Sequence, residues 1–313
     1  MTKDMPDVSV LIVNWNTKEL VGRCLDSLPA GMGDGLSFET IVVDNASVDG
    51  SPDLLRSRRH LTLLESEGNL GFAAAVNRAY RCSRAPLVLL LNADVELLPG
   101  SVAALVRLLD EHREAAGAAP LYRNPDGSPQ PFHFRFPTFA TTLANASALI
   151  AHLPGMERRL RSYAMLDDDF SRPRTVLQPS ASCLLLRRSC LSPDRIFDER
   201  YPIFFNDVQL ARSLSRAGCD FWVTPDAVVV HEGHASTRQL GGALKRQYIA
   251  SLVRMLEETE PARNVLVYRA VVLVQGLALL ALRRRNALSW ADLKAAVAGD
   301  PGTLPARPVS GNR

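Results

Sequence analysis

The sequence predicts an α/β fold, with a mostly parallel, Rossmann-like sheet flanked by helices and a helical extension at the C-terminal end. Three observations predict it. Short apolar runs alternate with segments whose apolar residues recur at helical spacing. The links between them are short, which favours right-handed crossovers between parallel strands. Several apolar runs end abruptly in Asn or Asp, and ligands collect beyond the carboxyl ends of such strands.

The first strands and helices follow one another closely. Residues 8–16 form an apolar run that leads into an amphipathic stretch at residues 19–28. Residues 38–43 form the second run, which ends on the carboxylate of Asp44 before another helical segment. Residues 61–65 predict a short third strand, after which a glycine-bearing turn at residues 68–71 enters an alanine-rich helix.

The next strand, residues 87–91, consists of five aliphatics and ends in the triplet Asn92-Ala93-Asp94. An uninterrupted run of this kind predicts a strand buried on both faces. Because alternate residues of a strand project to the same side, Asn92 and Asp94 can share a divalent cation. An Asx turn that merely closes the strand is the alternative. The carboxyl edge of the sheet is expected to gather these side chains: Asn14, Asp44, Asn69 and Asp94.

The second half is less regular. Residues 122–137 predict a loop, residues 137–153 and 155–163 predict helices, and residues 178–186 return to a strand with small residues at its start. The acidic run at residues 167–169 predicts a solvated turn.

A helical pattern begins near Asp207 and stops at Gly218. Asp207 has two interpretations, a cap that stabilises the amino end of the helix and a general base. A last strand at residues 221–230 delivers His231, and the β-branched residues before it argue against a helical zinc motif. His234 is interpreted as a surface loop residue.

Motifs in this order and spacing resemble those of a family 2 glycosyltransferase of the GT-A fold, most closely the bacterial rhamnosyltransferase-like branch that builds cell-surface polysaccharides. The resemblance extends from about residue 8 to about residue 237. The matching segments are residues 13–16, 42–51, 68–73, 91–94 and 206–207, together with His231.

The resemblance implies an inverting transferase for cell-wall or surface polysaccharide synthesis. It would move a sugar, with rhamnose or another deoxyhexose favoured, from a dTDP- or UDP-sugar donor to a hydroxyl of a glycan or polyprenol-linked glycan. Asp207 would be the base that deprotonates this hydroxyl. The usual Glu before it is Asn206, which removes one means of raising the pKa of Asp207.

The resemblance also implies a donor site and a metal site. Asn92 and Asp94 occupy the DxD position of the family, where Mg²⁺ or Mn²⁺ bridges the donor diphosphate, and His231 would complete the site. Asn92 supplies one negative charge fewer than the usual acid, which weakens the site for a hard cation. Asp44 would recognise the uracil or thymine ring. The other residues expected to bind the donor are Asn14, Asn16, Asn45, Asn69, Gly71, Ala93 and Ser182.

Two rival functions remain open at this point. A nucleotidyltransferase shares the nucleotide-binding sheet and the metal, but residues 14–20 lack a glycine- and basic-rich triphosphate loop. A degenerate binding protein that keeps the fold would explain Asn92 and Asn206 in place of acids, although Asp94, Asp207 and His231 are retained.

Length and composition agree with a cytoplasmic enzyme. The 313 residues, 47% of them hydrophobic, are expected to form a catalytic domain over residues 1–240 with a donor half (8–120) and an acceptor half (121–240). Five cysteines without paired spacing indicate reduced thiols, and the polar N-terminus does not read as a signal peptide. A net charge of +3 and no basic stripe argue against nucleic acid.

A helical extension is expected over residues 241–298, followed by a disordered tail at 299–313. Within the helical extension, residues 265–282 are strongly apolar and precede three arginines at 283–285. One interpretation is a helix packed on the catalytic domain or on a homodimer partner. Another is an interfacial helix on the cytoplasmic face of the inner membrane. A transmembrane span is the third, and Arg269 within the stretch argues against it.

Overall fold

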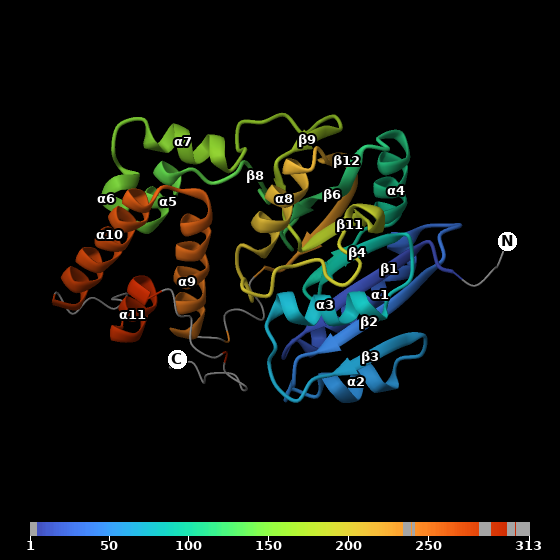
Figure 1. Cartoon of the computed structure of the whole chain (residues 1–313). Helices are drawn as coiled ribbons and strands as arrows, with labels where there is room; N and C mark the ends of the chain where they lie inside the picture. The colour runs from blue at the N-terminus through green and yellow to red at the C-terminus, as the bar shows by residue number, and fades with distance from the viewer. Residues whose placement is uncertain (1–4, 234–238, 240–241, 282–288, 299–303, 305–313) are drawn as a thin grey trace.

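The computed structural model describes residues 5–233, 239, 242–281, 289–298 and 304, and its centre is a sheet of ten strands (Figure 1). The first half of the chain contains β1 (Val8–Asn14), α1 (Lys18–Met32), β2 (Phe38–Asp44), α2 (Ser51–Ser57), β3 (Leu61–Glu65), α3 (Phe72–Cys82), β4 (Leu87–Asn92), β5 (Val95–Leu97), α4 (Ser101–Glu111) and β6 (Ala115–Arg123). The second half contains β7 (Pro129–Gln130), β8 (His133–Phe134), α5 (Phe139–Ala146), α6 (Ala148–Ala151), α7 (Met156–Tyr163), β9 (Arg174–Val176), β10 (Gln178–Pro179), β11 (Cys183–Arg187), the 3-10 turn η1 (Arg188–Cys190), α8 (Asn206–Arg216), β12 (Asp220–His231), α9 (Gly242–Thr259), α10 (Ala262–Ala281) and α11 (Trp290–Ala298).

The strand order is β3-β2-β1-β4-β11-β6-β12-β5, with β7 on β6 and β9 on β12. Strands β1 to β4 are mutually parallel, and β6 pairs with β12 in parallel. Strand β11 runs antiparallel between β4 and β6. The predicted arrangement, a mostly parallel sheet flanked by helices, is confirmed.

Both faces of the sheet are buried, as the continuous apolar strands predict. Alternate residues of β1 divide between two cores. Val10 and Ile12 pack with α1 and α4 on one face, whereas Leu11 packs with α3 and α8 on the other. Burial on both sides fixes the register of the strands, and therefore the positions of the polar residues that end them.

The polar strand endings meet at one edge of the sheet. Asn14 lies opposite Asp44, and Asn92 lies opposite Val13. His231 ends β12 and pairs with Val95, the residue directly after the triplet at 92–94. Strand endings as much as 217 positions apart in the chain, those of β1 and β12, thus lie at a single edge.

The second half departs from the prediction in three places. The predicted loop at 122–137 contains the end of β6 and the short strands β7 and β8. The predicted helix at 137–153 is interrupted at Ser147, whose φ of −140° is extended rather than helical. The acidic run at residues 167–169 is not simply solvated, because Asp168 forms ion pairs with Arg135 and Arg174, both at 2.9 Å. Two-residue strands and ion pairs between distant segments leave no periodic signal in the sequence, so the sequence does not predict them.

A third core joins the C-terminal helices to the rest of the chain. Tyr201 and Val208, next to the start of α8, pack with Leu252 and Val253 of α9 and with Val265 of α10. Helices α5, α6, α7, α9, α10 and α11 form the end of the molecule on the left of Figure 1.

Within the described residues, no helix is both long and apolar enough to cross a membrane. The boundary between catalytic domain and extension stays a prediction. His234, the three arginines at 283–285 and nearly all of the predicted tail lie outside the described residues.

Candidate active site

A cavity of about 310 Å³ opens at the edge of the sheet where the polar strand endings meet. Its walls come from the ends of β1, β4 and β12, the turns before α3 and β11, and the loop before α8. Nine of the twelve predicted site residues line it: Asn45, Asn69, Gly71, Asn92, Ala93, Asp94, Ser182, Asp207 and His231. The structure therefore brings together residues that are as much as 186 positions apart.

Asp207 lies in the first turn of α8 and faces this cavity. The N-cap residue of α8 is Phe205, which has a left-handed φ of 64° and makes no side-chain cap bond. Asp207 lies within the first turn and is therefore not the N-cap residue. The Asp207 Oδ1 accepts the N–H of Val208 at 2.8 Å. Burial raises the pKa of Asp207 to about 6, and backbone N–H groups, that of Val208 first, oppose the rise. A carboxyl with this pKa can take up and release a proton near neutral pH.

Asn206 occupies the position where the resemblance expects a Glu. Its side chain is buried and donates to the carbonyl of Ile203 at 2.8 Å and that of Tyr201 at 3.4 Å. These bonds hold the loop before α8, including the left-handed Phe205, and so fix the direction of the neighbouring Asp207.

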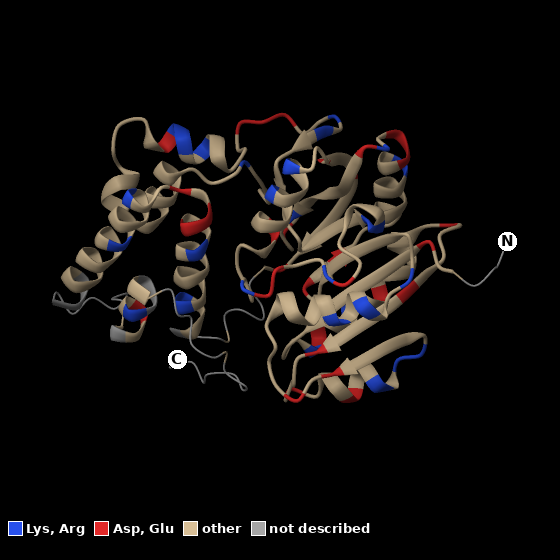
Figure 2. Cartoon of the chain, in the orientation of Figure 1, with Lys and Arg blue, Asp and Glu red and all other residues tan. Residues whose placement is uncertain are grey.

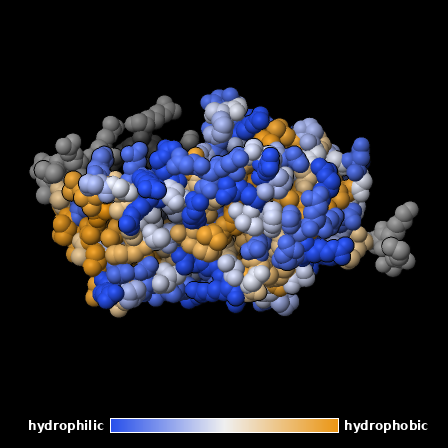
Figure 3. Space-filling view, turned by 90° about the horizontal axis from the view of Figure 1, so that it is seen from above, coloured by the Kyte–Doolittle hydropathy of each residue, from blue (hydrophilic) through white to orange (hydrophobic). Residues whose placement is uncertain are grey.

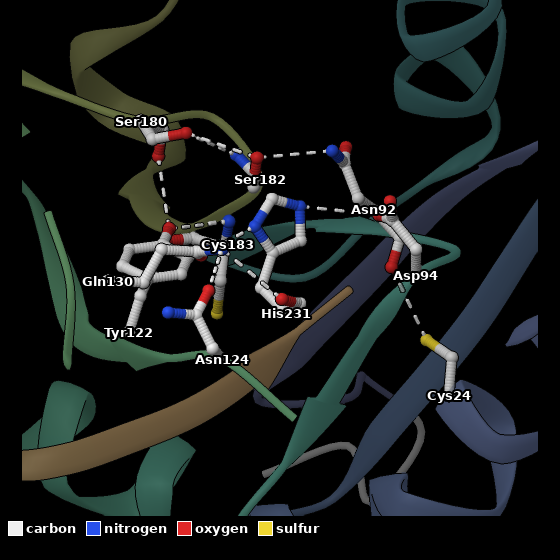
Figure 4. Close-up of polar contacts among 10 residues, drawn as sticks. All are labelled: Cys24, Asn92, Asp94, Tyr122, Asn124, Gln130, Ser180, Ser182, Cys183 and His231. Atoms are coloured by element: carbon white, nitrogen blue, oxygen red, sulfur yellow. Dashed lines mark hydrogen bonds and ion pairs between the residues drawn. The ribbon is translucent and has the colours of Figure 1, made fainter. Parts of the chain in front are cut away.

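His231 and Asp94 face each other across the cavity wall (Figure 4). The His231 Nε2 lies 3.5 Å from the Asp94 Oδ1, with both side chains largely buried. The His231 Nδ1 lies 2.9 Å from the Oε1 of Gln130, whose Nε2 donates to Asn124. Since the Oε1 of Gln130 can only accept, Nδ1 is the donor of this bond, and in the neutral imidazole Nε2, which faces Asp94, then carries the lone pair. A neutral imidazole nitrogen beside a carboxylate oxygen is a suitable donor set for a divalent cation.

Asn92 is held by the serine turn before β11. Its Nδ2 donates to the Oγ of Ser182 at 3.1 Å, and the Oγ of Ser180 donates to the same oxygen at 3.1 Å. A cation could bind only the carbonyl oxygen of the Asn92 side chain, and the bond from Nδ2 to Ser182 fixes the direction of that oxygen. The small residues of this turn therefore orient the first position of the DxD-like triplet.

Asn14, Asn16 and Asp44 do not line the cavity, although they lie at the same edge. The Asp44 Oδ1 accepts from Asn14 Nδ2 at 2.7 Å, and its Oδ2 accepts the N–H of Ser47 at 2.9 Å. Asn16 accepts from the N–H of Val48 at 2.7 Å. In this structure the three residues brace the turn after β2, which carries the cavity-lining Asn45.

Gly71 is required where the turn before α3 meets the loop before α8. Its φ of +82° is left-handed, and an added Cβ would lie 2.9 Å from the carbonyl oxygen of Pro202. The same carbonyl accepts the N–H of Phe72 at 2.7 Å. Asn69 and Asn45 bond to the two sides of Gly71, through its N–H at 2.9 Å and its carbonyl at 3.1 Å respectively.

Sequence reasoning missed several residues of the site. Trp15 and Phe132 supply aromatic walls, and Gln130 sets the tautomer of His231 from 101 positions away. The indole N–H of Trp15 and the Oδ1 of Asn45 are buried at the cavity without a hydrogen-bond partner among the described residues. Trp15 lies inside a recognised motif, which could have marked it. No local signal marks Gln130, because its role depends on a long-range contact.

Comparison with known proteins decides the family. The family model for glycosyl transferase family 2 matches residues 9–191, more than half of the chain. The chain belongs to glycosyltransferase family 2. It is therefore a nucleotide-sugar-dependent glycosyltransferase, and the nucleotidyltransferase and degenerate-protein alternatives are set aside.

The transferase is 32% identical over 250 residues to an N-acetylglucosaminyl-diphospho-decaprenol L-rhamnosyltransferase of Mycobacterium tuberculosis. That alignment covers 76% of this chain and 78% of the relative. Over 111 residues it is 31% identical to the succinoglycan biosynthesis protein ExoU of Rhizobium meliloti, covering 34% of this chain and 32% of that protein.

Solved structures agree on the fold. A mannosyltransferase from Pyrobaculum calidifontis in complex with GDP-Man and Mn²⁺ superposes with a TM-score of 0.52 at 18% identity, covering 95% of this chain and 86% of the other. GalNAc-T7 with UDP, GalNAc and Mn²⁺ gives a TM-score of 0.51 at 16% identity, covering 74% of this chain and 44% of the other.

Proposed function

We propose that this transferase inverts the anomeric carbon of a deoxyhexose, with rhamnose favoured, as it moves the sugar from a dTDP- or UDP-donor to a glycan linked to polyprenol diphosphate. The observation that carries the proposal is the position of Asp207, a carboxyl of raised pKa, in the same cavity as Asp94 and His231. The similarity to the mycobacterial rhamnosyltransferase supports the choice of sugar and of acceptor.

Asp207 is the base in this mechanism. The acceptor hydroxyl attacks the anomeric carbon from the face opposite the leaving diphosphate, and the Asp207 carboxylate takes its proton. A base with a pKa of about 6 is ionised near neutral pH and still retains enough basicity to help. The hydrogen bond from the N–H of Val208 fixes one carboxylate oxygen of Asp207.

A divalent cation fits the residues on the opposite wall. Asp94, the carbonyl oxygen of Asn92 and the Nε2 of His231 would hold Mg²⁺ or Mn²⁺, and the tautomer fixed by Gln130 makes His231 a competent ligand. When bound, the cation offsets the negative charge that develops on the departing diphosphate.

The donor nucleotide is placed by the turns after β1 and β2. Trp15 and Asn45 offer an unpartnered N–H donor and carbonyl acceptor at the cavity, a pair suited to a pyrimidine or ribose. Asp44 supports them as the predicted base-recognition residue, because its bonds to Asn14 and Ser47 hold the turn that carries Asn45.

The C-terminal helices contact the membrane peripherally in this proposal, which brings the enzyme to its lipid-linked acceptor. The space-filling view shows apolar surface gathered at the end formed by the C-terminal helices (Figure 3). On α10 the side chains of Leu266 and Val274 are 63% and 67% exposed, and on α6 that of Leu149 is 85% exposed. Apolar area of this kind can insert at a bilayer interface. Co-sedimentation with anionic vesicles tests the contact, and a Leu266→Glu/Val274→Glu variant should lose it.

The experiment that tests the function is transfer by purified full-length protein from a panel of UDP-, dTDP- and GDP-sugars to a synthetic N-acetylglucosaminyl-diphospho-prenol. Product is followed by mass spectrometry and its anomeric configuration by NMR, with and without MnCl₂. Transfer from one deoxyhexose donor with inversion is the expected result. Transfer with retention, or of an unrelated sugar only, would contradict the proposal.

A further inference from the structure

A second cavity, of about 690 Å³, lies beside the first and differs from it in charge. Its wall includes three arginines, Arg135, Arg158 and Arg159, together with the phenol of Tyr163. Hydroxyl groups of Thr138, Thr141 and Ser162 complete its polar lining, and no Asp or Glu is among its lining residues. Figure 2 shows basic residues on α7, which forms one side of this cavity.

Two of the arginines are available to a ligand. Arg135 is held by Asp168 through bonds of 2.9 and 3.0 Å. By contrast, the ion pairs formed within the described part of the chain involve neither Arg158 nor Arg159. Arg161, one turn further along the same helix, is paired with Asp167 and does not line the cavity. Free guanidinium groups are well suited to phosphate, since they form paired, charge-assisted hydrogen bonds.

Two helix N-termini add to the positive field. Thr138 and Thr141, which form the capping box of α5, both line the cavity. Gly155, the left-handed N-cap of α7, lines it as well. The amino ends of α5 and α7 therefore border the same space as the arginines, which favours an anion. The last turn of α7, with Ser162 and Tyr163, lines the cavity too and offsets part of the α7 dipole.

The two cavities are joined by the short ribbon of β8 and β10. His133 pairs with Pro179 and Phe134 with Gln178. Phe132 and Ser180 at one end of the ribbon line the first cavity, whereas Arg135 and Leu177 at the other end line the second. At a strand rise of 3.3 Å per residue the separation is about 10 Å, a span on the scale of one sugar and a phosphate.

Tyr163 lines the second cavity. Burial raises the pKa of its phenol, and the charges of Tyr248 and Asp207 raise it further by smaller amounts. Apolar side chains reach solvent near the second cavity: Leu177, which lines it, and Leu153 and Leu149, which precede the N-cap Gly155 in the chain, are 46%, 54% and 85% exposed.

We infer that the second cavity binds the diphosphate of the lipid-linked acceptor, with Arg158 and Arg159 on its phosphates. This inference rests on the proposed function, because it assigns the acceptor subsite of the same reaction. The sugar then reaches back along the β8–β10 ribbon to Asp207, and the prenyl chain leaves over Leu153 and Leu149. The arginines are binding residues, so their loss should weaken acceptor binding without slowing the chemical step.

The test is a binding titration that does not depend on turnover. Farnesyl diphosphate is titrated into full-length protein whose donor site is saturated with dTDP and MnCl₂, and binding is followed by calorimetry. Arg158→Gln and Arg159→Gln should each raise the Kd about tenfold, and the double variant more, because each removes a charge-assisted hydrogen bond. Arg161→Gln, which removes the same charge from the same helix outside the cavity, is the matched control and should change the Kd less than twofold.

Several outcomes would overturn the inference. Wild-type protein that fails to bind farnesyl diphosphate, or binding that survives in the double variant, would do so. So would a double variant that loses only its binding to phosphatidylglycerol vesicles, because the cavity would then hold membrane headgroups. Equal displacement by inorganic pyrophosphate and by farnesyl diphosphate would point to free phosphate instead.

A second readout separates this inference from the proposed function. With N-acetylglucosaminyl-diphospho-farnesol as acceptor, the double variant should raise KM about 10-fold or more with kcat retained. With the octyl glycoside of the same sugar, which has no phosphate, KM should not change. If neither acceptor receives sugar from any donor, the proposed function fails, while the farnesyl diphosphate titration still decides the occupant of the cavity.

Discussion

The two neighbouring cavities are lined by opposite kinds of side chain. The first presents Asp94, Asp207, His231 and amides, with no Lys or Arg among its lining residues. The second presents three arginines and two helix N-termini, with no Asp or Glu among its lining residues. If each cavity holds a diphosphate, as proposed, the first would need positive charge from a metal ion, whereas the second has it in its own arginines.

The two cavities also differ in how the chain builds them. The first lies at the ends of long strands that are buried on both faces, where register is strongly fixed. The second lies among short helices and the two-residue strands β8 and β10. The first cavity is thus built from long paired strands and the second from short elements.

Asp207→Asn should have the largest effect, since it removes the proposed base from the first cavity. We expect kcat to fall by about 10² to 10⁴ with donor binding unchanged, because general-base catalysis supplies rate enhancement of this size. The measurement is steady-state transfer together with calorimetric donor binding. Asp220→Asn, an exposed carboxyl at the start of β12, is the control and should retain full activity. A variant Asp207→Asn with normal kcat would remove Asp207 from the mechanism.

Asp94→Asn should come next, and it tests the claim that the first cavity relies on a cation. The variant leaves His231 facing amides alone, so kcat/KM should fall about 100-fold or more and the response to Mn²⁺ should weaken. Glu96→Gln, two residues along in β5, changes a carboxylate that pairs with Arg23 outside the cavity and should have little effect. An Asp94→Asn enzyme that responds to Mn²⁺ like the wild type would contradict the metal assignment.

Gln130→Leu should have an intermediate effect. It removes the acceptor that fixes the His231 tautomer, and loss of such a partner lowers metal affinity by about 10–100-fold. The concentration of Mn²⁺ for half-maximal activity should rise accordingly. Gln130→Glu keeps an acceptor at the same distance and should retain the wild-type value. Equal behaviour of the two variants would show that Gln130 only fills space.

A smaller effect concerns stability. The pKa of Asp207 is raised from its usual value of 3.8 to about 6, so folding favours the protonated form. Ionisation therefore costs native stability as pH rises from about 4 to about 6, and the cost stays constant above that range. Asp207→Asn should be more stable than wild type by at most about 3 kcal/mol above pH 6, and the difference should vanish below about pH 4. Thermal unfolding at both pH values measures this, and a variant less stable at high pH would contradict it.

The sequence predicted the first cavity better than the second for physical reasons. Strands such as residues 87–91 carry a strong apolar signal, and their polar endings fall where the fold must place them. Nine predicted residues accordingly line one cavity. The roles assigned to them stay predictions until they are measured.

The remainder could not be predicted because it depends on contacts between distant segments. Gln130 lies in a stretch that reads as loop, and only its contact with His231 gives it a role. Asp168 sits in a run of acids, yet it pairs with Arg135 at 2.9 Å across 33 positions. Arg158 and Arg159 look like an ordinary solvated helix face, and only the cavity that the fold builds beside them suggests a ligand.

The most direct test of the account is the pH dependence of single-turnover transfer, with donor and Mn²⁺ saturating. Asp207 must be ionised to accept the proton, so the rate should be level above about pH 7 and fall tenfold per pH unit below an apparent pKa of about 6. The residual rate of Asp207→Asn should lack this limb. A wild-type rate that stays level from about pH 8 to about pH 5, or a limb that persists in Asp207→Asn, would contradict Asp207 as the base.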